Sequence, residues 1–149
     1  MHTQKGFSLV EVLVTISLAS IVALIATPNF HRYSINTNLR SAAMDIAADF
    51  GSLKERALSE NTSFEVVFDR DQNIYTIQRG GVAIETKTPN SFGNEIRITS
   101  VVYNRPSNIT FETRGTASGG SVNLTNSRGS TATVTTTITG KTHVQFNML

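Results

Sequence analysis

The chain has 149 residues, a formal net charge of +2 and no cysteine. Its length suits one small domain, and its nearly balanced charge gives no overall signal for a protein that binds polyanions. The lack of cysteine excludes thiol catalysis, thiolate metal sites and disulfide bonds, so an exported domain of this chain would depend on packing alone.

The first predicted element is an apolar segment from Phe7 to Thr27, which follows a short polar leader ending in Gly6. If these 21 residues form a helix, it would be roughly 30 Å long, which is the thickness of the hydrocarbon core of a bilayer. The segment therefore predicts a membrane span. A plain single-pass anchor and a removed signal peptide are alternatives, although the apolar core of a signal peptide has only about 7–15 residues and Ala26-Thr27-Pro28 is a poor cleavage site.

Glu11 is the one acidic residue of the apolar segment, which has no Lys, Arg or His. An acid within a membrane costs several kcal/mol unless it has a partner, so its presence indicates a function. Glu11 must be protonated or must find a cation elsewhere. Cleavage between Gly6 and Phe7 would create one, the α-amino group of Phe7, in the same helix or on a neighbouring copy. A buried charge that only a neighbour satisfies would set the register between subunits.

From Gly6 to Glu11 the sequence reads Gly-Phe-Ser-Leu-Val-Glu, and the apolar segment and Pro28 follow. This order resembles the class III signal sequence of type IV pilins and of type II secretion pseudopilins. The resemblance implies that a prepilin peptidase cleaves after Gly6 and that Phe7 becomes N-methylated. It also implies that Glu11 pairs with the Phe7 amine of another subunit during filament assembly.

Pro28 should kink or locally melt a helix, because proline lacks an N–H donor and clashes with the preceding turn. A helix end at Pro28 is one alternative, but we expect the helix to continue to about Ser59. Apolar residues recur beyond Pro28 at helical spacing and would pack on a sheet. These residues are Leu39, Ala42, Ala43, Ile46, Ala47, Phe50, Leu53 and Ala57.

From Asn61 the apolar period changes to two, which is typical of strands. The predicted strands cover residues 64–68, 74–79, 82–85, 96–103, 109–111, 122–125, 131–138 and 142–146. In the strand 131–138, Ala132, Val134 and Ile138 would face the core, opposite an outer face of threonines. Residues 114–120, rich in Gly, Ser and Thr, would be flexible. The predicted fold class is α+β: a long N-terminal helix, transmembrane and then amphipathic, packed on an antiparallel β-sheet.

The C-terminal half carries a second resemblance. Residues 109–117 read ITFETRGTA, and residues 122–126 and 138–141 read VNLTN and ITGK. These segments resemble the GspH/FimT group of minor pilins and pseudopilins. The resemblance implies a prepilin leader at 1–6, a transmembrane and assembly helix at 7–28, and a periplasmic pilin domain at 29–149 that includes the second half of the helix.

These resemblances imply a structural subunit and not an enzyme. The expected function is that of a FimT/FimU-like minor pilin, which primes or tips the assembly of a type IV pilus; a GspH-like pseudopilin of type II secretion is the alternative. The implied location is the bacterial inner membrane, with a single pass and a periplasmic C-terminal domain, and then the filament. The implied partners are other major or minor pilins or pseudopilins, the prepilin peptidase and the inner membrane. The sequence predicts no catalytic residue, cofactor or metal site.

A further alternative is a DNA-binding minor pilin of natural transformation. Some FimT relatives use a C-terminal Gly-Arg-x-Arg motif, and the matching place here reads Gly140-Lys141-Thr142-His143. In a strand, Lys141 and His143 would point the same way and could face one phosphate strand. However, Lys lacks the bidentate geometry of Arg, and His is mostly neutral at pH 7. Further contacts could come from three arginines in predicted loops, Arg105, Arg114 and Arg128.

Overall fold

The computed structural model describes residues 7–103 and 108–149, and their side chains except for residues 25–31. The chain divides into two compact units, Met1–Ser34 and Ile35–Leu149. Gly6, Arg105 and the side chain of Pro28 lie outside the described parts.

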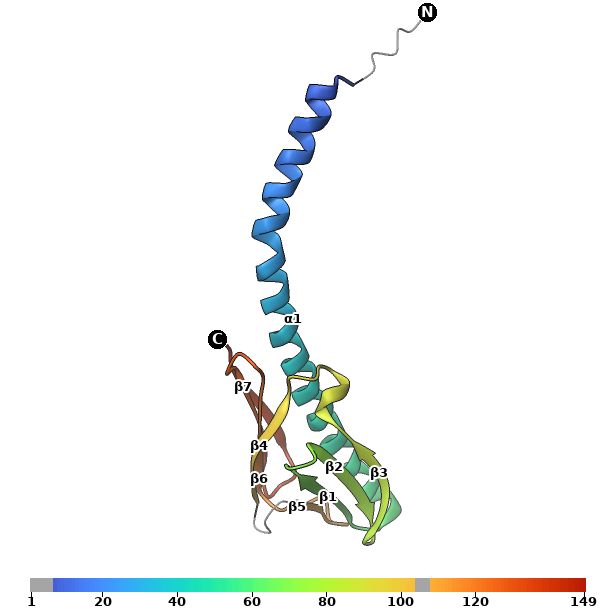
Figure 1. Ribbon diagram of the computed structural model, residues 1–149. Helices are drawn as coiled ribbons and strands as arrows, with labels where there is room; N and C mark the ends of the chain where they lie inside the picture. The colour runs from blue at the N-terminus through green and yellow to red at the C-terminus, as the bar shows by residue number, and fades with distance from the viewer. Residues whose placement is uncertain (1–6, 104–107) are drawn as a thin grey trace, which may run out of the picture. The chain divides into compact units, whose positions relative to one another are not determined.

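Helix α1 covers Leu9–Glu60 and passes through position 28, which confirms that the helix continues beyond the proline (Figure 1). The predicted apolar stripe is also confirmed. Seven of its eight residues are at most 2% exposed, and Ala47 packs half-buried beside them. Among the described residues, no helix combines the length and the hydropathy of a membrane span.

Over residues 7–103 and 108–149 the strands form two antiparallel sheets, whereas the sequence predicted one. The first sheet has the order β3-β2-β1-β5, with β1 at Phe64–Asp69, β2 at Ile74–Arg79, β3 at Val82–Lys87 and β5 at Asn108–Phe111. The second has the order β4-β6-β7-β8, with β4 at Arg97–Tyr103, β6 at Gly120–Thr125, β7 at Thr131–Thr136 and β8 at Thr142–Asn147. A short 3-10 helix, η1, covers Pro89–Ser91 before β4. The division arises because β5 returns to pair with β1, while β4 pairs with β6.

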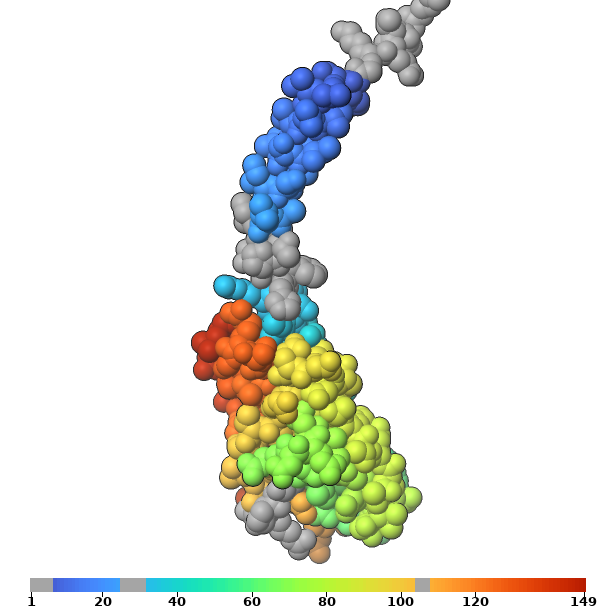
Figure 2. Space-filling model, viewed as in Figure 1, coloured from blue at the N-terminus to red at the C-terminus, as the bar shows by residue number. Residues whose placement is uncertain are grey.

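One core joins the second half of α1 to the inner faces of both sheets. The ring of Phe50 on the helix lies 6.3 Å from that of Phe68 on β1 and 5.6 Å from that of Phe111 on β5, between ring centroids. From the second sheet, Val122 and Val134 complete the core and are fully buried. Figure 2 shows the C-terminal strands, in orange and red, beside the segment around residues 90–100, in yellow.

The predicted end of the strand 131–138 was wrong. Strand β7 ends at Thr136, and Ile138 is 70% exposed instead of facing the core. The cause is a tight turn in which the amide of Thr137 donates to the carbonyl of Lys141, with Gly140 at a φ of 70°. Residues 114–120 include a turn in which the amide of Glu112 donates to the carbonyl of Thr116 at 2.9 Å, and their flexibility stays a prediction.

Candidate assembly segment and cationic residues

The first part of α1 presents apolar side chains on all sides. Phe7 is 82% exposed, and large apolar residues remain exposed as far as Leu24. They are Leu9, Val10, Val12, Leu13, Val14, Ile16, Leu18, Ile21, Val22 and Leu24. A helix that is hydrophobic all round is normally covered by lipid or by other protein. This segment therefore needs a partner that removes it from water.

Three hydroxyl groups of this segment are already hydrogen-bonded within the helix. Thr15, Ser17 and Ser20 each donate to a backbone carbonyl three or four residues earlier, at 2.8 Å. This geometry lets a hydroxyl remain hydrogen-bonded without water. The free-energy cost of burying these hydroxyl groups is therefore lower, which suits a helix that is to be placed in an apolar environment.

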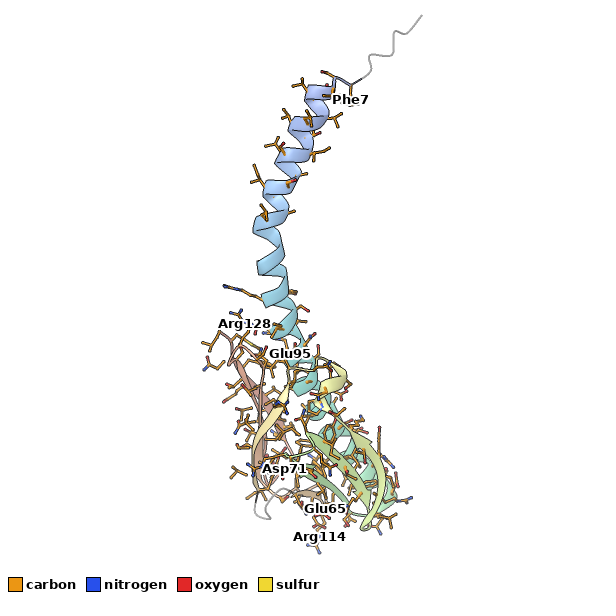
Figure 3. The ribbon with its side chains drawn as sticks, viewed as in Figure 1. Phe7, Glu65, Asp71, Glu95, Arg114 and Arg128 are labelled. Atoms are coloured by element: carbon orange, nitrogen blue, oxygen red, sulfur yellow. The ribbon has the colours of Figure 1, made fainter. Side chains whose placement is uncertain are left out.

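Glu11 lies in the first turn of α1 and is exposed. A negative charge is favoured there because the first N–H groups of a helix are unpaired and carry partial positive charge. Phe7 precedes the helix, as Figure 3 shows, and lies four residues from Glu11. The pairing of Glu11 with the Phe7 amine of a neighbouring subunit stays a prediction.

The structure does not gather the predicted cationic residues into one site. Arg114 lies in the turn after β5, and Arg128 in the turn between β6 and β7. Figure 3 shows these two residues at opposite ends of the globular unit. Lys141 precedes β8, and His143 lies within it; both are exposed. Arg128 thus cannot act together with Arg114 on a short ligand.

The turns that carry Arg114 and Lys141 do touch. A Cβ atom on Gly140 would lie 2.8 Å from the carbonyl oxygen of Gly115 and 2.9 Å from Cδ of Lys54. The ammonium group of Lys54 donates to the carbonyl of Thr139 at 3.0 Å. Lys54 was not predicted for this site, because it is on α1 and far away in sequence.

A polar depression of about 340 Å³ lies beside Arg114. It is lined by Glu112, Thr113, Arg114 and Thr116. The carboxylate of Glu112 partly offsets the positive charge of the arginine, so the depression is mixed in charge. Among the described residues, no group of three or more His, Asp or Glu side chains could hold a metal ion.

A cluster of titratable side chains joins α1 to the first sheet. The hydroxyl of Tyr75 donates to the carboxylates of Asp49 and Asp45, at 2.8 and 3.3 Å. Burial and the two acids raise the pKa of Tyr75 far above its ordinary value, so the phenol remains a neutral donor. Partial burial lowers the pKa of Lys87, but its hydrogen bond to Asp49 and the nearby acids outweigh burial, and the net pKa is raised. These contacts join elements of the fold.

Comparisons with known proteins agree with both parts of the molecule. Residues 1–27 match the family model of the prokaryotic N-terminal methylation motif. No curated protein matches the chain in sequence. Two structures of the minor pseudopilin EpsH from the type II secretion system of Vibrio cholerae are similar in fold. One is 12% identical with a TM-score of 0.60, and the match covers 73% of this chain and 97% of EpsH. The other is 11% identical with a TM-score of 0.61, and covers 74% and 94%.

At such low identity the structural match shows the fold alone, while the N-terminal match concerns the first part of α1 and the leader before it. The two findings are independent, because one rests on sequence and the other on the arrangement of α1 and the two sheets. Taken together, the chain carries the N-terminal methylation motif over residues 1–27, and its fold is similar to that of the minor pseudopilin EpsH.

Proposed function

We propose that the protein is a minor pilin, a structural subunit that primes or tips the assembly of a type IV pilus. The observation that carries this proposal is the exposed apolar start of α1, which has Glu11 in its first turn and lies behind the methylation motif. Such a helix can be stored in a membrane and then packed among the helices of other subunits. The action is mechanical.

The same features support a second role, that of a minor pseudopilin in type II secretion. The fold likeness to EpsH favours this alternative. Deletion of the gene separates the two roles: loss of surface pili with normal protein export supports the pilus role, and retained pili with blocked export supports the secretion role.

The proposed location is the bacterial inner membrane, with the Phe7–Thr27 segment in the membrane and the globular unit in the periplasm. Subunits would then move into the filament together with other pilins or pseudopilins. A prepilin peptidase would cleave between Gly6 and Phe7 and methylate the new amino terminus.

Intact mass spectrometry of the protein extracted from its native membrane tests this processing. The expected mass is that of a chain that starts at N-methylated Phe7. A chain that still starts at Met1, in cells that contain the peptidase, would refute the proposal. Replacing Gly6 by a bulky residue should block cleavage, whereas Gly6→Ala, the matched control, should be cleaved.

DNA binding is a third candidate function, and the contact between the Gly115 and Gly140 turns favours it. That contact puts the backbones next to Arg114 and Lys141 side by side, so two cations from different turns could reach one phosphate strand. A gel-shift assay with the full chain tests this function. The Lys141→Ala and His143→Ala double variant should weaken binding, whereas Arg128→Ala, at the other end of the unit, should leave it unchanged. Unchanged binding by the double variant would contradict the assignment.

A further inference from the structure

In the part of the chain that the structure describes, the two sheets have four edge strands, and three of these edges are blocked. The outer edge of β5 is occupied by residues 116–118, since the amide of Ser118 donates to the carbonyl of Thr110 and Phe111 bridges to Ala117. Covering an edge in this way prevents it from pairing with another chain.

Strands β3 and β4 are blocked by other means. In β4 the amide of Ile98 donates to the side chain of Asn73 at 2.8 Å, and the register with β6 shifts between Ile98 and Ser100. In β3 the register with β2 also shifts, and the strand carries the charged residues Glu85 and Lys87. Irregular register and charged side chains both disfavour the addition of a further strand.

Strand β8 has none of these features. It pairs with β7 over six consecutive residues without a shift, and among the described residues no other strand pairs with it. Its sequence, Thr-His-Val-Gln-Phe-Asn, has no Lys, Arg, Asp, Glu or Pro. Val144 and Phe146 pack against the core but are only partly buried, and Arg40 of α1 lies over the Phe146 ring, 5.0 Å from its centroid. An added strand would therefore cover apolar surface and extend the sheet at the edge that β8 forms.

The sequence of β8 is complementary to itself in one antiparallel register. If Gln145 lies opposite Gln145 of a second copy, Val144 lies opposite Phe146 on the core side, and His143 lies opposite Asn147 on the outer side. Thr142 then lies opposite Met148, which also packs against the core. Every apolar side chain of β8 then lies opposite a core-side residue of the other copy. The one titratable residue of β8, His143, lies opposite the neutral amide of Asn147.

We propose that two copies of this protein associate through β8, with Gln145 on the two-fold axis, and form a continuous eight-stranded sheet. The backbone ladder holds the two strands together, and the alternation of side chains sets the register. A ladder of this length is short, so the association is weak and is favoured where the protein is concentrated. This inference does not depend on which filament the protein serves.

Cysteine cross-linking of the full-length protein in detergent tests the proposal, because the natural chain contains no cysteine. Residues directly opposite each other in an antiparallel pair have Cβ atoms about 5 Å apart, which suits a disulfide after a small shift. Gln145→Cys should therefore form a disulfide-linked dimer under mild oxidation. Ala83→Cys, exposed on the blocked edge of β3, is the matched control and should cross-link several-fold less.

The register is tested with two further variants. His143→Cys alone should not cross-link, because its counterpart lies four residues along the other strand, roughly 13 Å away. A mixture of His143→Cys chains and Asn147→Cys chains should give the mixed dimer. Adding Gln145→Lys to both chains puts two cations opposite each other, and should reduce the mixed dimer at low salt and less so at high salt.

Two results would overturn the proposal. One is equal cross-linking of Gln145→Cys and Ala83→Cys, which would mean that β8 has no preference for a second copy. The other is cross-linking of Gln145→Cys, in cells, to a different protein and not to itself, which would mean that another chain occupies the edge.

Discussion

Lys87 on the edge strand β3 donates to both carboxylate oxygens of Asp49 on α1, with its ammonium nitrogen 2.7 Å from Oδ1 and 2.9 Å from Oδ2. The hydroxyl of Tyr75 donates to the same carboxylate at 2.8 Å. The side chain of Asp49 is only 16% exposed and that of Lys87 is 29% exposed, so water screens the pair less than it would at a surface. The carboxylate of Asp49 thus accepts hydrogen bonds from both β2 and β3 and connects these strands to α1.

Asp49→Ala should destabilise the globular unit by about 2 kcal/mol, because the half-buried ammonium of Lys87 loses its hydrogen-bond acceptor and the buried phenol of Tyr75 loses the nearer of its two acceptors. The full chain in detergent can be unfolded with urea and followed by near-UV circular dichroism. Asp45→Ala is the matched control, one helical turn away, where Tyr75 makes a longer contact of 3.3 Å and Lys87 makes no hydrogen bond. Its effect should be clearly smaller. Equal losses from the two variants would contradict a central role for Asp49.

Stability should fall at alkaline pH because of Tyr75 and Lys87. The folded pKa of each lies above its ordinary value of 10.0 or 10.5. A group whose pKa is raised by folding contributes stability below its unfolded pKa, and this contribution is lost as the pH rises towards the folded pKa. The decline should therefore begin near pH 10 and steepen above it. Unfolding measured between pH 8 and pH 11.5 checks this, and Tyr75→Phe should make the decline shallower. An unchanged slope in that variant would count against the explanation.

The amphipathic part of the fold could be predicted from sequence because its signal is periodic. The stripe from Leu39 to Ala57 keeps helical spacing, and the strands from Phe64 onward alternate, so both were placed within a few residues. The division into two sheets was missed, since the choice of β1 as the partner of β5 is a long-range decision with no local signal. Ile138 was misplaced because its alternation continues through a turn that depends on Gly140.

The candidate site was predicted less completely than the fold. Phe7 and Glu11 lie in one short motif, which a reading of the sequence can recognise. The contact between the Arg114 and Lys141 turns, and the position of Lys54 beside them, depend on how α1, β5 and β7 pack. Nothing in the local sequence of these residues records that packing.

Gly120 at the start of β6 is required by packing. A Cβ atom there would overlap the carbonyl oxygen of Val102 and the ring of Tyr103, because the tyrosine ring lies across the glycine. Gly120→Ala should therefore cost about 1–3 kcal/mol of unfolding free energy. Gly119→Ala is the matched control, since its nearest contact is the exposed and movable side chain of Ile138, at 3.3 Å. Thermal unfolding of both variants measures the difference. Equal stability of the two would mean that both the Val102 backbone and the Tyr103 ring can move aside.

Glu11→Ala should separate processing from assembly. The variant keeps Gly6, Phe7 and the apolar face, so it should be cleaved and inserted like the natural chain. It should fail to enter filaments, because the carboxylate that pairs with the Phe7 amine of a neighbour is gone and that amine would be buried without a partner. Immunoblots of membrane and sheared-filament fractions measure the two steps separately.

Thr15→Ala is the control for this last variant, one turn further along the same side of α1. The hydroxyl of Thr15 is satisfied by the carbonyl of Val12, at 2.8 Å, and therefore needs no partner on another subunit. This variant should assemble normally. If Glu11→Ala also assembled normally, the carboxylate would not set the register, and its position in the first turn would serve only the helix dipole, a contribution of about 0.3–1 kcal/mol.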